Sequence, residues 1–324
     1  MHQTIRWAEG PVVLAATHPS SKIVLIQDGA SLHEVAAMLE RERLVKSRFA
    51  FIILAKSQSA DRKVHAGEYE LNAGMTLAEI LSKLLSSQVL LHPVTIPEGL
   101  TLTQIASLLS QQGLIDQTEF LRLGKDRTYI ASLGIKADTL EGYLYPNTYK
   151  FPRNVKTREV LTAMVEQLRE VLRPDLLARM QELKMTMHEV LTLASVIEKE
   201  TGVGSDRLDI SAVFHNRLKQ HIPLQSDPTV IYGLPVFDGN LRKKDLLNPS
   251  PYNTYRVKGL PPGPISNPGI QAIRATLYPS DSRALYFVSR NDGTTQFSKT
   301  LTEHNQAVEK YQRRPLRKVS SPRL

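Results

Sequence analysis

Two glutamates lie in the last turn of a helix that the sequence predicts from Thr186 onward. Thr186 and Glu189 form a capping box, and apolar residues follow at helical spacing as far as Ile197. Glu198 and Glu200 come next, where the negative end of the helix dipole disfavours a carboxylate. Glu200 also extends the apolar stripe, so we expect its pKa to be raised. A glutamate that stays protonated near neutral pH has the property that a general acid needs.

The same segment has an ordinary interpretation. Glu-Lys-Glu is typical of a solvated helix end, with Lys199 softening the charge. For an isolated Glu-Lys-Glu, this second interpretation is the more common one. Carboxylates placed where the dipole disfavours them nevertheless break a local rule, and such breaks tend to mark functional sites.

A second cluster spans residues 140–149 and combines aromatic rings with hydrogen-bonding groups. Its candidate substrate-binding residues are Glu141, Tyr143, Tyr145, Asn147 and Thr148. Aromatic faces beside polar groups are suited to holding sugar rings. An amphipathic strand followed by a turn would show the same pattern, so both interpretations stay open.

Two further clusters place polar side chains on turn-rich segments. The first contains Gln225, Asp227 and Thr229, and the second contains Tyr252 and Asn253. Positioned binding groups are common on such loops, although ordinary turn chemistry accounts for the same residue types.

A weak repeat in the N-terminal third predicts the elements that precede these clusters. A turn glycine, a Ser/Thr N-cap and an apolar helical stripe recur in three copies, whose N-cap residues are Ser31, Thr76 and Thr101. Short β-type runs at 23–26 and 94–96 precede the first and third copies, and residues 67–71 lead into the second. Such βα units recur in modules that grip carbohydrate chains, and equally in generic α+β packing.

The remaining elements are mostly helical. Helices are predicted at about 156–172, 174–183, 205–220 and 301–312, with Gly202 ending the helix that carries Glu200. A looser region is expected after Gly113, and ordered loops are expected through the proline- and glycine-rich stretch 248–269. Residues 284–288 and 294–297 predict a hairpin across Asn291-Asp-Gly293.

Composition excludes several classes of protein. The chain has no cysteine and no His-Glu-x-x-His, Walker or Gly-x-Ser-x-Gly motif, so neither a metal nor a cofactor is predicted. Five of the positive charges behind the net +9 lie in 313–324, which predicts a solvated basic tail rather than a nucleic-acid interface. No stretch reaches the roughly 18 apolar residues of a membrane span, so the chain as given is predicted to be soluble.

Taken in order, the four clusters resemble the endolytic murein transglycosylases, the MltG or YceG-like family. The likeness rests on Leu-Glu-Gly-Tyr-Leu-Tyr-Pro-Asn-Thr-Tyr at 140–149, Ala-Ser-Val-Ile-Glu-Lys-Glu-Thr at 194–201, Gln-Ser-Asp-Pro-Thr-Val-Ile-Tyr-Gly at 225–233, and Ser-Pro-Tyr-Asn-Thr-Tyr at 250–255 before Leu-Pro-Pro-Gly-Pro-Ile at 260–265. It covers residues 23–311.

The resemblance implies an α+β fold in which small LysM-like βα modules precede a mixed α+β YceG-type catalytic domain. It implies a lytic transglycosylase that cleaves nascent peptidoglycan strands internally and leaves 1,6-anhydroMurNAc ends. The catalytic residue of the family motif corresponds to Glu200. By the same resemblance, Glu198 and the candidate residues of the other three clusters correspond to residues of the substrate-binding cleft. Their individual roles are less defined.

The resemblance also divides the chain. Residues 1–22 form an N-terminal extension, 23–90 a LysM-like module, 91–312 the catalytic domain and 313–324 the tail. The resemblance implies an N-terminal transmembrane helix, which is not predicted in this sequence, and a location at the inner membrane with the catalytic domain in the periplasm. Implied partners are peptidoglycan strands and penicillin-binding synthases; contact with the membrane is expected only through such an anchor.

Three other functions compete with this one. A two-carboxylate muramidase would pair Glu200 with Glu141 or Asp227 and use water. A non-catalytic peptidoglycan-binding scaffold would bind glycan and release no fragments. Nucleic-acid binding through the tail would depend steeply on salt.

Overall fold

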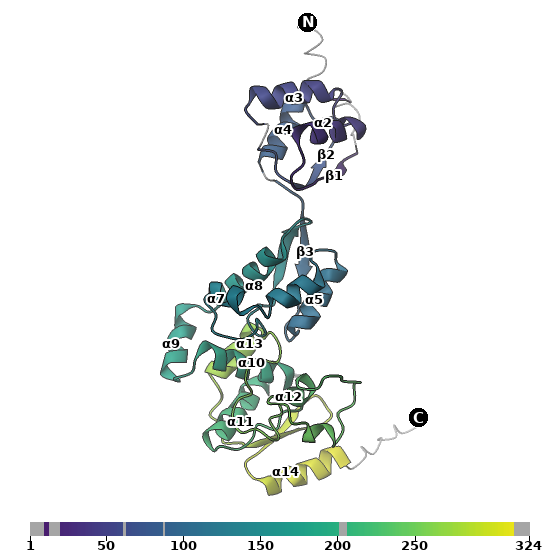
Figure 1. Cartoon of the computed structure of the whole chain (residues 1–324). Helices are drawn as coiled ribbons and strands as arrows, with labels where there is room; N and C mark the ends of the chain where they lie inside the picture. The colour runs from purple at the N-terminus through teal and green to yellow at the C-terminus, as the bar shows by residue number, and fades with distance from the viewer. Residues whose placement is uncertain (1–9, 13–19, 61–62, 87, 201–205, 314–324) are drawn as a thin grey trace, which may run out of the picture. The chain divides into compact units, whose positions relative to one another are not determined.

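The computed structural model describes residues 10–12, 20–60, 63–86, 88–200 and 206–313. Two compact units divide the chain (Figure 1). The first unit comprises residues 1–94, 111–115 and 148–156, and the second comprises 95–110, 116–147 and 157–324. Each unit is mixed in secondary structure, with small two-stranded sheets, so the predicted α+β class is confirmed at this level.

The first unit is built around an antiparallel strand pair packed with three helices. In chain order these are β1 (Lys22–Ile26), α2 (Leu32–Arg41), α3 (Arg48–Ser57), β2 (Gly67–Leu71) and α4 (Leu77–Leu85). The predicted N-caps form complete capping boxes, because Ser31 and Thr76 exchange hydrogen bonds with Glu34 and Glu79. Apolar residues of all five elements share one core. β3 (Leu91–Thr95) and β4 (Thr148–Pro152) form a second strand pair.

The second unit begins with helices that the sequence only partly predicts. They are α5 (Leu102–Gln111), α6 (Gln117–Leu123), α7 (Arg127–Ser132), α8 (Thr157–Val171) and α9 (Pro174–Glu182). The expectation of a looser region after Gly113 is wrong, because α6 and α7 lie there. Asp116 and Asp126 cap these two helices with their side chains, and each helix is too short to show a clear apolar period.

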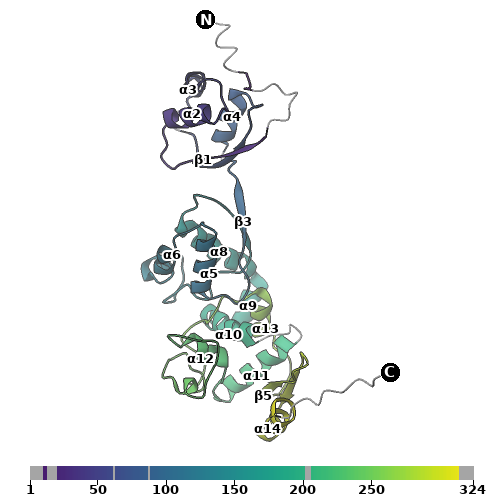
Figure 2. The same cartoon turned by 90° about the vertical axis from the view of Figure 1, so that its right-hand side faces the viewer.

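Four helices meet at the centre of the second unit (Figure 2). α10 (Met187–Glu200) packs against α11 (Arg207–Lys219), α12 (Asp227–Tyr232) and α13 (Ile270–Leu277). Every residue of α10 from Val190 to Ile197 is buried. The predicted end of this helix at Gly202 lies outside the described residues.

The C-terminal elements match the predicted hairpin and helix. β5 (Tyr286–Ser289) pairs antiparallel with β6 (Thr295–Ser298), and α14 (Leu301–Val308) continues as a π-helical turn, η3 (Glu309–Arg313). The segment between α12 and α13 is loop apart from the short 3-10 turn η2 (Asp245–Leu247), as its prolines and glycines predict. Among the described residues, no helix combines the length and apolar character that crossing a bilayer requires.

Candidate active site

Helix α10 presents Glu200 from a firmly anchored scaffold. Its first turn has the predicted capping box, in which the Thr186 N–H donates to Glu189 Oε2 at 2.8 Å and the Glu189 N–H donates to Thr186 Oγ1 at 3.2 Å. Farther along, Ser195 Oγ accepts the Ile265 N–H at 3.0 Å. The helix is thus tied at its first turn and again at Ser195, and Glu200 is its last residue.

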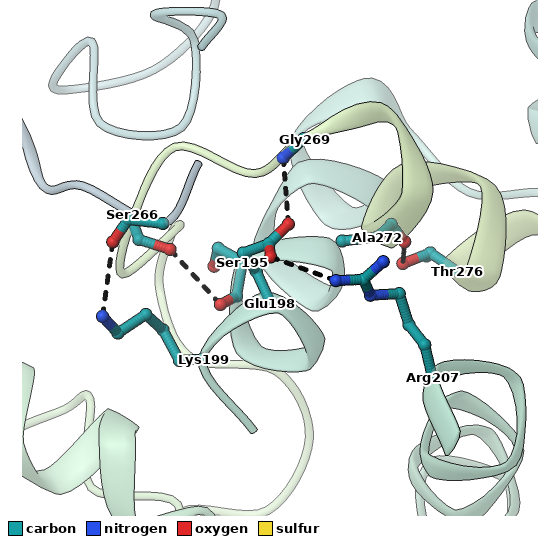
Figure 3. Close-up of polar contacts among 9 residues, drawn as sticks. Ser195, Glu198, Lys199, Arg207, Ser266, Gly269, Ala272 and Thr276 are labelled. Atoms are coloured by element: carbon teal, nitrogen blue, oxygen red, sulfur yellow. Dashed lines mark hydrogen bonds and ion pairs between the residues drawn. The ribbon is translucent and has the colours of Figure 1, made fainter. Parts of the chain in front are cut away.

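Glu198 points toward the start of α13. One carboxylate oxygen accepts the Gly269 N–H at 3.0 Å, and the other forms an ion pair with Arg207 at 3.4 Å (Figure 3). Lys199 Nζ donates to the Gly99 carbonyl at 3.3 Å. Glu198 therefore caps a neighbouring helix, and its role in binding substrate stays a prediction.

Glu200 is partly buried, and its carboxyl is hydrogen-bonded to Ser226. Ser226 Oγ donates to Glu200 Oε1 at 2.6 Å. Burial raises the pKa of Glu200 to about 7; the hydrogen bond from Ser226 and the positive charge of Arg217 oppose the rise, and the negative charge of Asp227 adds to it. The predicted upward shift of the pKa is confirmed, with burial as its largest cause.

Asp227 is the carboxylate next to Glu200. It is exposed, begins α12, and accepts a hydrogen bond of 2.6 Å from the Tyr255 hydroxyl. Burial, this hydrogen bond and the charges of Asp227 and Glu200 raise the pKa of Tyr255, so its hydroxyl stays a donor. The site thus holds an acid with a raised pKa beside an exposed carboxylate.

Two buried threonines fix the backbone that carries Ser226. The Ser226 N–H donates to Thr254 Oγ1 at 3.0 Å, and Thr229 Oγ1 donates to the Ser226 carbonyl at 2.6 Å. The two threonine hydroxyls lie 2.8 Å apart, and both residues are fully buried. Because every group in this network has a partner, the Ser226 hydroxyl is held in place toward Glu200.

Arg217 secures the turn before Ser226. Gln225 has a φ of 53°, a left-handed conformation that costs energy for a residue with a side chain. Arg217 Nη1 donates to the Leu224 carbonyl at 2.8 Å and to Gln225 Oε1 at 3.3 Å, while the Gln225 N–H donates to the Thr254 carbonyl at 3.1 Å. The buried guanidinium thus holds the strained turn and also lowers the pKa of Glu200 by its charge.

Glu141 lies in a separate, buried position. Its side chain accepts the Leu102 N–H at 3.0 and 3.1 Å, Asn267 Nδ2 at 3.0 Å and the Tyr232 hydroxyl at 3.2 Å. Only 4% of the residue is exposed, and burial raises the pKa of its carboxyl to about 7 against these hydrogen bonds. Glu141 joins the start of α5 to the end of α12, and direct contact with substrate stays a prediction.

The other candidates from the second cluster have varied surroundings. Tyr143 is buried, and its hydroxyl lies 2.9 Å from His188 Nδ1. Tyr145 is buried beside Ile270. Asn147 and Thr148 are exposed, and Thr148 belongs to the first unit. The predicted contact of these four residues with sugar stays a prediction.

Tyr252 and Asn253 shape the loop beside the site. The Tyr252 ring lies 4.8 Å from that of Tyr232, centroid to centroid. Asn253 is fully buried and donates from Nδ2 to the carbonyls of Leu246 and Asn248 at 2.9 and 2.7 Å. The predicted contact of both residues with substrate stays a prediction.

Sequence reasoning missed Ser226, Arg217, Thr254 and Tyr255. Three of them stand inside the motifs at 225–233 and 250–255, so closer attention to every polar residue of those motifs would have found them. Arg217 lies in an unremarkable helix and gave no signal. Within the described part of the chain, no group of three or more His, Cys, Asp or Glu side chains is arranged to hold a metal ion.

Comparisons with known proteins agree with the motifs. The family model of the YceG-like family matches residues 24–310. The endolytic murein transglycosylase of Bacillus subtilis (strain 168) is 37% identical over 302 residues, which cover 88% of this chain and 83% of that protein. The endolytic murein transglycosylase of Streptococcus pneumoniae serotype 2 (strain D39) is 31% identical over 316 residues, which cover 87% of this chain and 57% of that protein.

A solved structure gives the same result for the fold. The crystal structure of a YceG-like protein from Listeria monocytogenes matches with a TM-score of 0.62 at 35% sequence identity, covering 88% of this chain and 98% of that one. The resemblance drawn from the four motifs is thereby confirmed. This chain belongs to the YceG-like family.

Proposed function

We propose that the protein is an endolytic lytic transglycosylase of peptidoglycan. It cleaves the MurNAc–GlcNAc bond inside nascent glycan strands, leaves 1,6-anhydroMurNAc ends and so terminates strand elongation. The observation that carries the proposal is Glu200, a partly buried carboxyl with a pKa of about 7 and a fixed hydroxyl donor. The name endolytic murein transglycosylase, borne by the relatives from Bacillus subtilis and Streptococcus pneumoniae, supports it.

A single carboxyl suffices for this reaction because the substrate supplies the nucleophile. Protonated Glu200 gives its proton to the glycosidic oxygen as the bond from that oxygen to C1 of the muramic residue breaks. The resulting carboxylate takes the proton of the C6 hydroxyl, whose oxygen forms the new bond to C1. Glu200 is protonated again and no water is consumed. The hydroxyl of Ser226 stabilises the carboxylate between the two steps.

The test combines product analysis with one substitution. Mass spectrometry of digested strands should show anhydro ends, and reducing ends would reject this mechanism. Glu200→Gln should lower kcat by at least about a thousandfold, the upper range of general acid–base catalysis, without changing the fold. Glu170→Gln, an exposed carboxyl on α8, is the matched control and should retain activity. Full activity of Glu200→Gln would reject the residue assignment.

The exposed carboxylate of Asp227 favours one alternative. A carboxylate beside the acid is able to activate water, as in two-carboxylate glycosidases, and its charge already affects Glu200. The protein would then be a muramidase and would produce reducing ends. The same mass spectrum separates the two functions.

The domain assignment is also a proposal. A LysM-like module at 23–90 is supported by the order β1, α2, α3, β2, in which two helices connect an antiparallel strand pair. We assign 91–312 to the catalytic domain, with 1–22 as the extension and 313–324 as the tail. Two results would support the module. Purified glycan should bind to residues 23–90, and deleting these residues from the full chain should weaken its binding to glycan.

The location and the partners of the protein are also proposals, and family resemblance supports them. We propose action at the periplasmic face of the inner membrane, on peptidoglycan strands, next to penicillin-binding synthases. Co-purification of a synthase with the full-length gene product after crosslinking in cells would test the partnership.

A further inference from the structure

A closed loop lies next to the site, and its two ends meet beside the end of α12. It starts after α12 at Leu234 and returns at Pro249. Its neck is tight, because a Cβ at Gly233 would lie 2.4 Å from Ser250 Oγ. The tilted ring pair of Tyr232 and Tyr252 lies at the same neck. Loops whose ends meet in this way are compact surface features and are frequently functional.

We call residues 234–249 together with 256–258 the basic lobe. Internal hydrogen bonds give it a fixed shape, since Asn253 holds two of its carbonyls and Arg256 Nη1 donates to the Leu247 carbonyl at 2.7 Å. Arg242 pairs with Asp238 inside the lobe. The lobe lies among the green loops next to α12 in Figure 1.

The lobe exposes large apolar side chains at an unusual density. Val236 is 82% exposed and Leu247 is 68% exposed, with Phe237 and Val257 at 40% and 36%. These are four of the eight large hydrophobic residues that are exposed among the described residues of the second unit. Burying such side chains away from water is favourable, so contact with an apolar phase or partner would stabilise the lobe.

The same lobe also carries an excess of positive charge. The lobe has five basic residues against two acidic ones. Lys243, Lys244 and Lys258 are exposed, and within the described chain no carboxylate lies in ion-pair range of any of them. Lysine is depleted in the cores of protein interfaces, whereas apolar side chains ringed by cations are typical of proteins that lie on anionic lipid.

We propose that the basic lobe docks onto the surface of an anionic bilayer. Its lysines meet lipid phosphates, and Val236, Phe237 and Leu247 enter the boundary between head groups and acyl chains. This contact differs from an N-terminal anchor, because it belongs to the unit that carries Glu200. The neck of the lobe leads into α12 and Tyr255, so docking would hold the site close to the lipid surface.

Vesicle binding of the full chain tests the proposal. The probe is a vesicle of phosphatidylglycerol and phosphatidylcholine, compared with phosphatidylcholine alone. Replacing Lys243, Lys244 and Lys258 with Gln should weaken binding to the anionic vesicles about a hundredfold. The matched control replaces three exposed lysines elsewhere in the unit, Lys125, Lys136 and Lys219, and should change binding less than threefold. Equal loss in both triple variants would overturn the proposal.

A local probe separates the lobe from the basic tail. Trp7 is the single tryptophan of the sequence, so a Trp7→Phe, Phe237→Trp protein reports from the lobe alone. Brominated acyl chains should quench this tryptophan, and an unquenched signal from bound protein would overturn the proposal. Val236→Ser with Leu247→Ser should weaken binding without any change of charge. If these variants instead lose binding to purified sacculi and keep vesicle binding, the lobe is a polymer-binding surface and not a lipid-binding one.

This outcome is independent of the reaction at Glu200. Vesicle binding requires no turnover, so a protein that cleaves nothing still tests the lobe. Conversely, if the enzyme is active but its lobe does not bind vesicles, the proposed function stands and only the proposed docking is rejected.

Discussion

Ser226 Oγ lies 2.6 Å from Glu200 Oε1 and donates a hydrogen bond to it. The two residues are 26 positions apart, and Thr229 and Thr254 fix the serine from the other side. Ser226 thereby opposes the burial that raises the pKa of Glu200. The balance between burial and this hydrogen bond sets the pH range in which the carboxyl gives and takes a proton.

Ser226→Ala should change the pH profile of the enzyme. Loss of the donor removes an interaction that lowers the pKa of Glu200, so the pKa should rise above about 7. The limb of the kcat profile that reports deprotonation of the acid should move to higher pH. We expect kcat to fall about tenfold to a hundredfold, since hydrogen bonds to charged groups contribute about 1.5–3 kcal/mol. Kinetics from pH 5 to pH 9 will measure both effects.

Ser211→Ala is the control for a merely structural loss. Ser211 is fully buried on α11 and donates to the Ala275 carbonyl at 2.7 Å, away from Glu200. Its replacement should cost about 1 kcal/mol of stability and leave the pH profile in place. An unchanged profile in Ser226→Ala would show that the serine does not act on the carboxyl.

Asp227→Asn should shift the same profile in the opposite direction. The negative charge of Asp227 raises the pKa of Glu200, so its removal should move the limb to lower pH. The Asn Oδ1 is still able to accept from Tyr255, which keeps the local geometry. The products that remain should have anhydro ends. If cleavage is lost by more than about a thousandfold, Asp227 is a catalytic base, as the muramidase function requires.

Glu141 should make stability depend on pH. Its pKa is about 7 in the folded protein and near 4.5 when unfolded, so the unfolded chain releases its proton first as the pH rises. The contribution is fully present below pH 4.5 and is lost as the pH passes through 7, by at most about 3 kcal/mol. Glu141→Gln removes this titration. The difference in unfolding free energy between pH 5 and pH 8, measured with urea, should therefore be smaller in the variant.

Glu166→Gln, at an exposed position on α8, provides the comparison for Glu141. It should keep the pH dependence of the wild type. At pH 5, Glu141→Gln should itself be less stable by about 1–3 kcal/mol, since an amide cannot accept from both Leu102 and Asn267 in the same way. Identical pH dependence in all three proteins would contradict the assignment.

Gly142 should tolerate no side chain, for two separable reasons. Its φ is 84°, and a Cβ there would lie 2.4 Å from two ring atoms of Pro264. Gly259 has a φ of 86° with no atom within 4 Å of such a Cβ. Gly259→Ala should therefore cost only the backbone strain, about 1 kcal/mol, whereas Gly142→Ala should cost at least about 2 kcal/mol more. Equal melting temperatures for the two variants would show that Pro264 yields.

Local sequence rules determined most elements of this protein. The capping boxes at Ser31, Thr76 and Thr186, the apolar stripe of α10 and the hairpin across 291–293 all depend on residues a few positions apart. The same local reasoning marked Glu200 as a carboxyl with a raised pKa. It failed after Gly113, where two short helices rely on their caps and on packing.

Only the tertiary structure decided what surrounds each carboxyl. Glu198 and Glu200 lie two positions apart in the same helical turn, yet Glu198 caps α13 through Gly269 and Glu200 meets Ser226. Glu141, an expected partner at the sugar, is buried among donors 39 to 126 positions away. Turn and helix signals come from neighbours in the chain, whereas burial and long-range hydrogen bonds exist only once the helices have packed. The sequence by itself therefore determined which residue is the acid, and the fold determined its partners.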